Sequence, residues 1–558
     1  MTIVLGINKT VPLPNHDSAA TIVKDGKVLA SVQEERITRI KHDGNIPYNA
    51  IKECLRISGV APEEVDAIAT STQLTPLPGP SAFFKYGVSV KGLVQALPTA
   101  FLRTLILRKI RDYFGFKCKI YFVNHHLSHA ASAYYTSGFK DCLTLAMDGG
   151  GDYRAGGLFH CENGSLKEMP EKFPMNKSMG YFYSAVADVL GFHPTDGEGK
   201  VMGLACYGKP LFVNELEDII KNNDSSLTGI KIDYKDKKKF TRYRYDHILL
   251  GDKFKPFIKD DGRDLAASAQ KVLEKNVVNL LKKAFEKDGT KNLALSGGTF
   301  FNCKLNKIIR EELGLGEIFI HPAAGDSGVQ TGAAFEVCKR LDPENFKSEK
   351  MEHVYYGTEY SDEEIMSAIK NSGLKTEELK DPSGAAADMI NKGMVVGWFQ
   401  GKMEYGPRAL GNRSVLADPT NIEVKEKLNN ALKQRDWFMP FAPSMLDEAK
   451  EEYLINATES PFMIMTFDVP KEKIKEIPAV VHVDGTARPQ TVKKEINPKY
   501  WRVIKEFEKY KVPVILNTSF NKHGLPIVMS PEDALEHLIW KCIDVLIIGN
   551  FLVERKLN

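Results

Sequence analysis

Three histidines stand close together in the stretch VNHHLSHAASAYY, namely His125, His126 and His129. On a helix, residues four positions apart lie one turn apart on the same face, so His125 and His129 would point in one direction. Imidazole pairs at this spacing serve as ligands of a single metal ion. The stretch therefore predicts part of a metal site, with histidines that only cap or pack a helix as the alternative.

Two carboxylates elsewhere in the chain complete this predicted site. Asp148 ends an apolar run in LAMDGGGD, and Asp326 stands in HPAAGDSG. Both lie beside glycine, where the backbone can approach a small ligand closely. Two imidazoles and two carboxylates suit Fe(II), Zn or Mn, and the residue types do not choose among them. Each aspartate taken singly is equally explained as a turn or cap residue.

Glycine-rich turns follow several predicted strands. Ser296 to Asn302 (SGGTFFN) is one, Gly149 to Gly151 another, and Gly325 and Gly328 bracket Asp326. Exposed backbone N–H groups without side-chain obstruction are what phosphate binding requires. None of these turns is a Walker A loop or a Rossmann fingerprint. Together they favour a nucleotide cleft of the actin and sugar-kinase kind.

A second group of anion-binding side chains is predicted near the C-terminus. Arginine binds phosphate through two parallel hydrogen bonds, lysine adds a point charge, and asparagine and serine add neutral donors. These residue types occur in GPRALGNRS, LKQRDW, VHVDGTARPQ and LNTSFN, as Arg408, Arg413, Lys433, Arg435, His482, Arg488, Asn517, Ser519 and Asn521. The set suits a small, doubly charged phosphorylated substrate, whereas solvated surface cations are the alternative.

The elements that must position these residues form an α/β pattern. TIVLG and TIVKDGKVLAS predict strands that turn at Asp25-Gly26, and DCLTLAMDGGGDYRAGGLFHCENGSL repeats this arrangement. The repetition predicts an internally duplicated domain. A long helical segment is predicted at 264–287, before a third glycine-rich strand end in NLALSGGTFFN. Charge rises and apolar periodicity lapses near 345–355, so we predict domains at 1–348 and 352–558.

Composition excludes several classes of protein. The 558 residues include 43% hydrophobic residues, which is too many for a disordered chain. The 75 Lys+Arg and 72 Asp+Glu nearly cancel, so no nucleic-acid partner is expected. Eight cysteines without a CxxC pair indicate no disulfide scaffold. No signal peptide or transmembrane run is recognised, which predicts a cytoplasmic protein.

Several motifs, taken as a set, resemble the O-carbamoyltransferase family, which includes nodulation-factor, cephem and aminoglycoside carbamoyltransferases. The similarity extends over nearly the whole chain, in HDSAA, HHLSHAASA, MDGGGD, EGKVMGLACYG, LSGGTFFN, HPAAGDSG, GPRALGNRS and LNTSFN. The resemblance implies an actin-like first domain, similar to tRNA threonylcarbamoyl transferases, and a YrdC-like second domain.

The resemblance also implies roles for individual residues. Fe(II), or a substitute divalent metal, would be held by His125, His129, Asp148 and Asp326. The nucleotide would lie near Glu198, Lys200, Gly203, Gly297, Gly298 and Asn302, with Arg408 and Arg413 facing ATP phosphates. Carbamoyl phosphate would contact Lys433, Arg488, Asn517 and Ser519, with His482 as an additional contact.

The chemistry that the family implies has two steps. Carbamoyl phosphate and ATP, with Mg²⁺, give carbamoyladenylate in the second domain, and the carbamoyl group then passes to an acceptor hydroxyl of a sugar or small natural product in the first. A general base must accept the hydroxyl proton, and His16 in NHDSAA is the candidate. A loop histidine that contacts a turn is the alternative for His16.

Three other functions compete with this interpretation: an actin-fold sugar kinase, a tRNA threonylcarbamoyl-type transferase, and a non-catalytic nucleotide-binding regulator. The kinase leaves the histidines and LNTSFN without a role, and the regulator predicts degraded anion-site residues.

The stretch 78–111 combines six Lys or Arg residues with apolar ones and contains no acidic residue. It predicts a solvated helix face or a surface for an anionic or lipid-linked acceptor.

Overall fold

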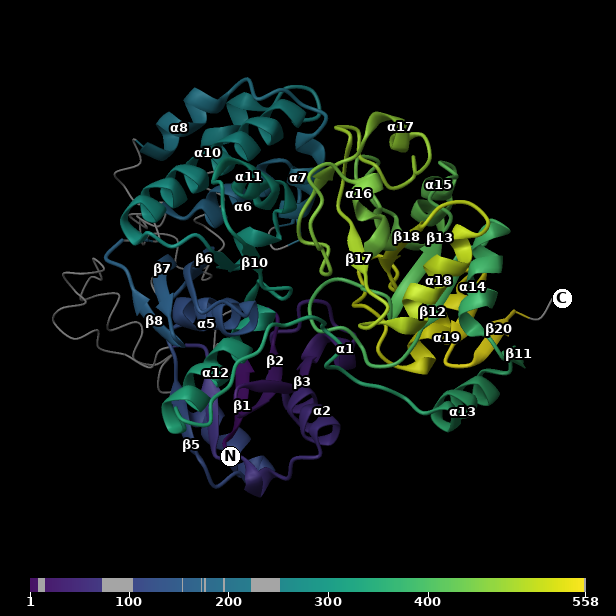
Figure 1. Ribbon diagram of the computed structural model, residues 1–558, viewed down its shortest axis with the longest axis horizontal. Coiled ribbons are helices and arrows are strands. Elements are labelled where there is room, and N and C mark those ends of the chain that lie inside the picture. The colour runs from purple at the N-terminus through teal and green to yellow at the C-terminus, as the bar shows by residue number, and fades with distance from the viewer. Residues whose placement is uncertain are drawn as a thin grey trace, which may run out of the picture. The chain divides into compact units, whose positions relative to one another are not determined.

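The computed structural model describes residues 1–8, 16–72, 104–152, 154–171, 173–174, 177–193, 196–221 and 251–555 (Figure 1). The chain forms two compact units, one of residues 1–34 and 42–351, the other of residues 35–41 and 352–558. Most of the basic stretch 78–111 lies outside the described residues, so its predicted role stays a prediction.

The first unit contains two five-stranded sheets of the same topology. One sheet has the order β3-β2-β1-β4-β5, and the other has the order β10-β9-β6-β7-β8. In each sheet the first strand, β1 or β6, starts an antiparallel meander of three strands on one side. On its other side it pairs with a parallel strand, β4 or β9, which in turn pairs with a second parallel strand, β5 or β10. The strands are β1 Ile3–Asn8, β2 Ala19–Lys24, β3 Lys27–Gln33, β4 Ala67–Thr70, β5 Lys119–Phe122, β6 Asp141–Gly151, β7 Arg154–Glu162, β8 Ser165–Glu168, β9 Leu293–Ser296 and β10 Ile318–Ile320. This repetition confirms the predicted duplicated, actin-like α/β domain.

Local sequence explains the first repeat. The hairpin between β2 and β3 turns at Asp25 and Gly26, whose φ angles are 49° and 89°. Two consecutive positive φ angles are the requirement of the turn that best joins twisted antiparallel strands, and Asp-Gly meets it readily. Buried apolar residues occupy β1 and β2, so both faces of this sheet are covered.

Two helices connect the sheets through one hydrophobic core. Helices α5 (His125–Ser137) and α12 (Val329–Leu341) contribute small buried residues, among them Ala130, Ala133 and Ala334, to a cluster that also includes Val4 of one sheet and Ala146 of the other. A Cβ on Gly332 would lie 1.8 Å from the carbonyl oxygen of Ser128, so this close helix contact requires glycine. Figure 1 shows α5 and α12 between β1 and β7.

The remaining helices of the first unit flank the sheets. The long helix predicted at 264–287 is confirmed as α10. These helices are α2 Tyr48–Ser58, α6 Met179–Val189, α7 Glu198–Ala205, α8 Val213–Lys221, α10 Arg263–Asp288 and α11 Cys303–Glu312. The stretch before Gly59 contains two helices, because α1 (Glu34–Thr38) ends well before α2 begins.

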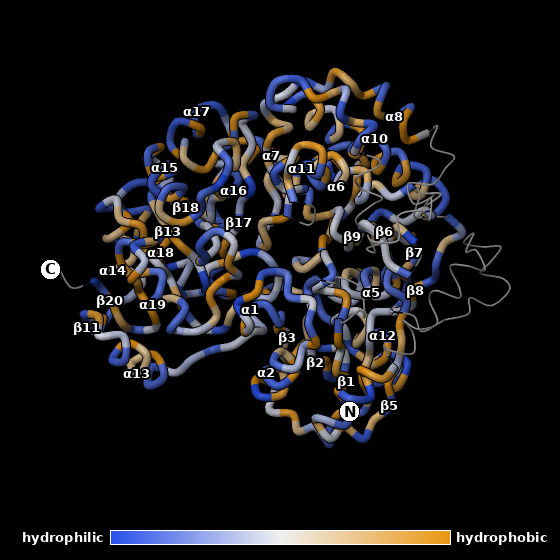
Figure 2. Tube along the Cα trace, turned by 180° about the vertical axis from the view of Figure 1, so that it is seen from behind, coloured by the Kyte–Doolittle hydropathy of each residue, from blue (hydrophilic) through white to orange (hydrophobic). Residues whose placement is uncertain are grey.

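The second unit is built on a mixed eight-stranded sheet with the order β11-β20-β19-β12-β13-β18-β14-β17. The strands are β11 Lys375–Glu378, β12 Val396–Phe399, β13 Arg413–Ala417, β14 Ala442–Leu446, β17 Gln490–Val492, β18 Val514–Ser519, β19 Val545–Ile548 and β20 Phe551–Glu554, with β15 Phe467–Asp468 and β16 Thr486–Ala487 as a separate pair. Central strands such as β19 are fully buried and apolar, and the hydropathy of each segment can be followed in Figure 2. An α/β unit is confirmed, and its likeness to YrdC stays a prediction.

Helices cover this sheet, and three short ones lie in its loops. They are α13 Asp362–Ser372, α14 Pro382–Asn391, α15 Val424–Leu428, α16 Lys450–Tyr453, α17 Lys471–Ile474, α18 Pro498–Glu508 and α19 Pro531–Ile539. Several begin at clear caps: Ser361 and Ser530 each accept a hydrogen bond from the third residue of the helix that follows.

Residues 35–41 belong to the second unit, although they precede most of the first unit in the chain. Arg36 donates to the carbonyl of Gly406 (2.9 Å) and Arg39 to those of Pro526 and Ile527 (2.9 and 2.7 Å). Arg39 also pairs with Asp533 at 3.2 Å. The predicted domains at 1–348 and 352–558 are therefore not strictly contiguous, because arginines near the start of the chain bond to backbone carbonyls hundreds of residues away.

No helix among the described residues is both long and apolar enough to cross a membrane.

Candidate functional site

Helix α5 carries the histidine pair, and its start is determined locally. The Asn124 side chain caps the helix by accepting hydrogen bonds from the N–H groups of His126 (3.0 Å) and Leu127 (3.1 Å). The helix therefore begins at His125, and His125 and His129 lie one turn apart. The two carboxylates come from strand ends: Asp148 from β6, and Asp326 from the segment after β10.

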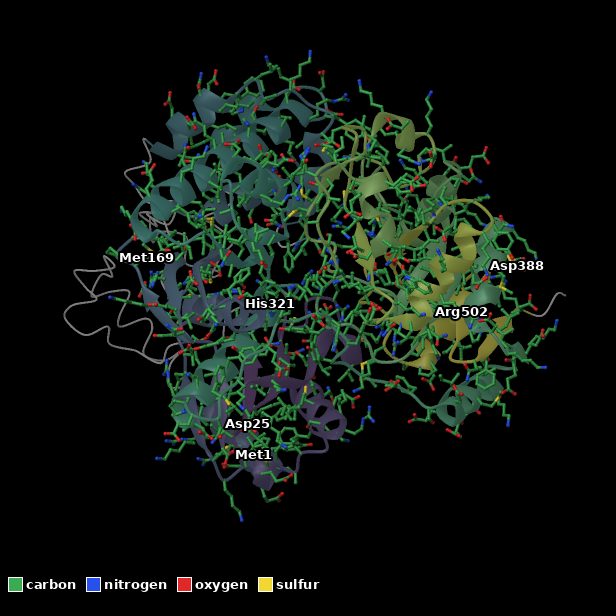
Figure 3. All side chains as sticks on the ribbon, viewed as in Figure 1. Met1, Asp25, Met169, His321, Asp388 and Arg502 are labelled. Carbon is green, nitrogen blue, oxygen red and sulfur yellow. The ribbon has the colours of Figure 1, made fainter. Side chains whose placement is uncertain are left out.

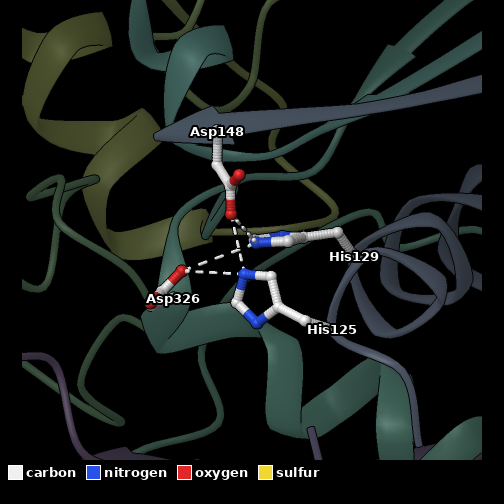
Figure 4. A group of neighbouring side chains, drawn as sticks. All are labelled: His125, His129, Asp148 and Asp326. Atoms are coloured by element: carbon white, nitrogen blue, oxygen red, sulfur yellow. Dashed lines mark hydrogen bonds and ion pairs between the residues drawn. The ribbon is translucent and has the colours of Figure 1, made fainter. Parts of the chain in front are cut away.

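The four predicted ligands meet in the first unit (Figure 4). His125 Nε2 lies 2.7 Å from Asp148 Oδ2 and 3.6 Å from Asp326 Oδ1. His129 Nε2 lies 3.5 Å from each of the same two oxygens. One atom from each of the four side chains falls within 4.8 Å of all the others. Residues from three distant segments thus converge as the sequence predicts.

These atoms fit a divalent cation. His129 Nε2 is buried and makes no hydrogen bond within the described part of the chain, although it points at two carboxylates. Three of the four nitrogen–oxygen distances are 3.5 or 3.6 Å. That spacing is close to the roughly 3.4 Å between ligand atoms that share a tetrahedral ion at about 2.1 Å. The donor set suits Fe(II), Zn or Mn alike, and the bound metal stays a prediction.

Side chains around the four ligands orient them. His126 Nε2 lies 3.0 Å from the second oxygen of Asp148, and His129 Nδ1 lies 3.2 Å from Ser296 Oγ. Such outer contacts set the ring orientation and tautomer of metal-binding histidines. The sequence shows His126 beside the pair but gives no sign of this role, which depends on the approach of β6. Gly151 is required here, because a Cβ would lie 2.2 Å from the His125 ring.

Charges in the cluster reinforce one another. Burial opposes ionisation of His125, yet Asp326 and Asp148 raise its pKa to about 10. Burial also opposes ionisation of Asp148, but His126 and His125 hold its pKa well below the usual value. Nearby His321 is labelled in Figure 3, and burial lowers its pKa to about 4, which keeps that ring neutral. The cluster therefore presents ionised carboxylates to a cation.

The predicted nucleotide loop follows β9. Gly297 has a φ of 106°, and a Cβ there would lie 2.0 Å from the Met147 carbonyl oxygen, so only glycine fits. Gly298 is different: a Cβ there would meet no atom within 4 Å, which leaves its backbone beside open space. Thr299 Oγ1 is buried and has no hydrogen-bond partner among the described residues. This loop has the form expected of an anion-binding turn.

The other predicted nucleotide residues lie on neighbouring helices. Glu198 begins α7 and accepts a hydrogen bond from Ser184, the Lys200 ammonium lies 5.4 Å from the Phe192 ring centroid, and Gly203 is buried. Asn302 caps α11 through the N–H of Leu305 and exchanges hydrogen bonds with Gln270. Its amide is therefore engaged within the protein, and contact between Asn302 and a nucleotide stays a prediction.

In the second unit Lys433 is buried beside the end of β18. Its Nζ donates to the carbonyl and hydroxyl of Ser519 (2.6 and 2.9 Å) and to the carbonyl and side-chain oxygens of Asn521 (3.1 and 2.8 Å). Burial, and then Arg435, lower its pKa well below the usual value. The structure thus brings Lys433 and Ser519 into direct contact.

Arg435 lies near this lysine and Arg488 lies near Arg435, and neither arginine has an acidic partner in the described part of the chain. Burial lowers the pKa of Arg435 to about 10, and the positive charge of Arg488 lowers it further. Within the described ranges neither arginine forms an ion pair, and Arg435 contacts the Phe441 ring at 5.5 Å. Uncompensated cations at close range indicate an anion-binding site. His482 lies before Arg488 in the chain and its Nε2 is 3.1 Å from the Phe438 carbonyl oxygen.

Asn517 lies deeper in the same sheet. Its Nδ2 donates to the carbonyl of Ala409 (3.2 Å) and to Ser444 Oγ and Gln490 Oε1 (3.0 and 3.2 Å). Its Oδ1 is buried and has no partner among the described residues. Asn517 and Ser519 lie two residues apart on β18 and therefore on one face of the strand, whereas Asn521 lies beyond its end.

In the GPRALGNRS stretch, Arg413 is the first residue of β13 and forms its hydrogen bonds within the protein. Arg413 is 0% exposed, donates to the carbonyls of Thr358, Gln400, Gly401 and Asn412, and stacks on Phe399 at 3.6 Å. Burial lowers its pKa to about 10. Arg408 is only partly buried. Contact of both arginines with ATP stays a prediction, but for Arg413 the described contacts are structural, because carbonyl groups accept hydrogen bonds from both of its terminal nitrogens.

Replacing Arg413 by methionine should therefore lower the free energy of unfolding by about 2–4 kcal/mol, because carbonyl oxygens lose a buried charged donor. Urea unfolding followed by tryptophan fluorescence measures this loss. Arg502→Met is the matched control: Arg502 is 54% exposed and pairs with Asp381, so we expect a change below about 0.5 kcal/mol. A normally stable Arg413→Met variant with weakened ATP binding would contradict the structural role.

The segment that carries the predicted base His16 is linked to the segment of a predicted metal ligand. Asn8 Nδ2 donates to the carbonyl of Asp17 (3.1 Å) and to that of Asp326 (2.8 Å), which ties the His16 segment to a predicted metal ligand. The His16 side chain is 41% exposed, and its Nδ1 lies 2.8 Å from Asp17 Oδ2. The charge of Asp326 also raises the pKa of His16, so the two side chains lie within electrostatic range of each other.

Two family models match this chain. One, described as the carbamoyltransferase N-terminus, matches residues 4–75 and 86–335, and the other, the carbamoyltransferase C-terminus, matches residues 387–555. The chain belongs to the carbamoyltransferase family. It is an enzyme that transfers a carbamoyl group from a donor to an acceptor, and the family resemblance drawn from the motifs is confirmed.

Similar proteins agree with this assignment. This carbamoyltransferase is 37% identical to nodulation protein NolNO of Sinorhizobium fredii, over 98% of this chain and 80% of that protein. It is 39% identical to nodulation protein NolO of Bradyrhizobium diazoefficiens, over 78% of this chain and 79% of that protein. Nodulation protein U of Sinorhizobium fredii is 27% identical, over 93% and 95% of the two chains.

Solved structures resemble this carbamoyltransferase only distantly. HypF of T. kodakarensis is 17% identical, with a TM-score of 0.31 over 62% of this chain and 50% of that one. A ROK hexokinase from Thermus thermophilus is 13% identical, with a TM-score of 0.30 over 62% and 100%. The fold assignment therefore rests on the duplicated sheet topology described above.

Proposed function

We propose that this carbamoyltransferase is an ATP- and metal-dependent O-carbamoyltransferase that works in two steps. The observation that carries the proposal is that the chain contains two clusters of polar side chains, one in each unit, with different chemistry. The first unit holds a carboxylate–imidazole cluster in which one buried nitrogen has no hydrogen bond among the described residues, and the second holds buried Lys433 beside Arg435, with Arg488 close to Arg435.

The first step suits the cation group of the second unit. Water attacks the phosphorus of carbamoyl phosphate and releases inorganic phosphate, and an oxygen of the resulting carbamate then attacks the α-phosphorus of ATP and displaces pyrophosphate. Lys433 and the two arginines bind the phosphate groups and balance their charge. Ser519 and Asn517, on one strand beside Lys433, supply neutral hydrogen-bonding groups that orient the carbamoyl end. The products are carbamoyladenylate, pyrophosphate and phosphate.

The second step suits the first unit. The acceptor hydroxyl attacks the carbamoyl carbon, AMP leaves with the bonding electron pair, and His16 Nε2 takes the hydroxyl proton. A divalent ion such as Fe(II), held by His125, His129, Asp148 and Asp326, would supply Lewis acidity when bound. The glycine loop around Gly298 binds the nucleotide part of the intermediate through backbone N–H groups. The acceptor is a hydroxyl-bearing sugar or small natural product.

A direct assay tests this function. The protein is incubated without oxygen with ATP, Mg²⁺, Fe(II) and carbamoyl phosphate, and pyrophosphate, AMP and ADP are measured. We expect pyrophosphate release that requires both ATP and carbamoyl phosphate, and a carbamoyladenylate ion in the mass spectrum. Glucose, N-acetylglucosamine and chitin oligomers serve as acceptor probes, each gaining one carbamoyl group if used. Formation of ADP on sugar addition, without pyrophosphate, would establish the sugar kinase instead.

A further inference from the structure

A chain of alternating histidines and aspartates extends from His16 in the first unit. His16 Nδ1 lies 2.8 Å from Asp17 Oδ2, and His42 Nδ1 lies 2.8 Å from the other oxygen, Asp17 Oδ1. His42 Nε2 then lies 3.0 Å from Asp196 Oδ1. Each oxygen of Asp17 therefore accepts from one histidine ring, and His42 connects two carboxylates.

The backbone of Asp17 and His42 is held in an unusual conformation. Asp17 has a φ of 63° and His42 a φ of 55°, both in the left-handed region that residues with a Cβ rarely adopt. Such conformations persist where surrounding contacts impose them, and they concentrate at functional sites. Here the Asp17 carbonyl accepts from Asn8 Nδ2 at 3.1 Å, and Asn8 Oδ1 accepts from Ser71 Oγ at 3.1 Å. Buried side chains thus hold Asp17 in place.

The contacts determine which nitrogen of His16 is basic. A carboxylate at Nδ1 favours the form in which Nδ1 carries the hydrogen, so the lone pair lies on Nε2. Both ring nitrogens of His42 face carboxylates, and both can donate only when the ring is a cation. His42 therefore supplies a positive charge beside Asp17, and this charge balances the carboxylate that His16 contacts.

We propose that Asp17 and His42 are positioning residues for His16, with Asp196 as the anchor of His42. In this arrangement Asp17 aims Nε2 of His16 at the acceptor hydroxyl, and the His42 cation limits how strongly Asp17 attracts the proton. As the hydroxyl oxygen bonds to the carbamoyl carbon, the O–H bond breaks, an N–H bond forms at Nε2, and the bond to AMP breaks. The inference rests on the proposed function, in which His16 is the base.

The charges that face these rings agree with the arrangement. Burial lowers the pKa of His16, Asp17 and Asp326 raise it, and His42 lowers it, with a net rise to about 9. Burial likewise lowers the pKa of His42, but Asp17 and Asp196 raise it to about 10. Removing His42 should therefore raise the pKa of His16, whereas removing the charge of Asp17 should lower it.

Two variants test the positioning roles through opposite shifts. Because a base must be unprotonated, transfer rises with pH through the pKa of His16. His42→Gln should move this limb of the pH–rate profile to higher pH, and Asp17→Asn should move it to lower pH. Asp17→Asn should also reduce turnover in the transfer step by about 10³- to 10⁴-fold, because the ring loses its orientation. Pyrophosphate release in the first step should be unchanged in both variants.

A measurement without substrate keeps the test independent of activity. NMR titration of histidine-labelled protein reports the pKa of His16 directly, assigned by its loss in His16→Asn. The matched control is His160→Gln, since His160 contacts Asp288 at 2.7 Å in the same unit. This variant should leave the titration of His16 unchanged. His42→Gln retains a donor toward Asp17, so the predicted rise in the pKa of His16 can be measured in this variant even if Asp17→Asn unfolds.

The outcomes separate this inference from the proposed function. Opposite shifts of the His16 titration in the two variants support the positioning roles. Shifts in the same direction, or titrations identical to the wild type, overturn them even if carbamoyl transfer is observed. If the wild type releases no pyrophosphate, the proposed function fails, whereas opposite NMR shifts would still support the arrangement of Asp17 and His42 around His16.

Discussion

His129→Ala should reduce carbamoyl transfer to an acceptor hydroxyl by about 10³-fold or more, while carbamoyladenylate formation continues within about twofold of the wild-type rate. His129 Nε2 points between two carboxylates and has no hydrogen bond among the described residues, so its removal deletes a proposed cation ligand and breaks few structural contacts. The effect should be confined to the second step, because the carbamoyladenylate site that we propose lies in the other unit.

Metal content provides the independent measurement for this variant. Mn²⁺ binding, followed by electron paramagnetic resonance, should be lost in His129→Ala. His126→Ala should weaken it by about 10- to 100-fold, since His126 contacts the second oxygen of Asp148 and acts from outside the ligand set. His160→Ala is the control, and it should bind metal normally. Retention of both Mn²⁺ binding and transfer in His129→Ala would refute the metal centre.

Arg488→Ala should lower kcat/KM for carbamoyl phosphate by about 100-fold in pyrophosphate release. A charge-assisted hydrogen bond to phosphate contributes roughly 2–3 kcal/mol, and 1.4 kcal/mol corresponds to a factor of ten. Arg488 forms no ion pair in the described part of the chain, and its charge acts unfavourably on Arg435. Its removal should therefore leave the free energy of unfolding unchanged or slightly higher, as is common for residues kept for binding.

Ligand-induced stabilisation separates binding from damage to the fold. Carbamoyl phosphate should raise the thermal midpoint of the wild type, because a ligand that binds the native state stabilises it. The increase should disappear in Arg488→Ala and return in part in Arg488→Lys, which restores the charge without the paired donors. Arg502→Ala, an exposed surface change in the same unit, should behave like the wild type. An unaltered shift in Arg488→Ala would remove this arginine from the site.

The sequence predicted the duplicated α/β domain and the spacing of His125 and His129 because both follow from local rules. Strand alternation, an Asp-Gly turn and the 3.6-residue period of a helix depend on residues close in the chain. The cap at Asn124 is equally local, and it places the start of α5 at His125. The motifs that resemble carbamoyltransferases likewise lie in short stretches, so the family was recognisable without a structure.

Tertiary packing alone decided which atoms these residues meet. Arg413 and Arg488 are the same residue type in similar glycine- or proline-containing stretches, yet one is enclosed by carbonyl groups and the other has no acidic partner among the described residues. The contacts of His42 with Asp17 and Asp196 span 25 and 154 residues, and those of Arg39 with 526–527 span almost the whole chain. Periodicity carries no information about such pairs. Contacts between distant segments are set by how helices and sheets pack, and packing determines burial, which decides whether a charged side chain serves the fold or a ligand.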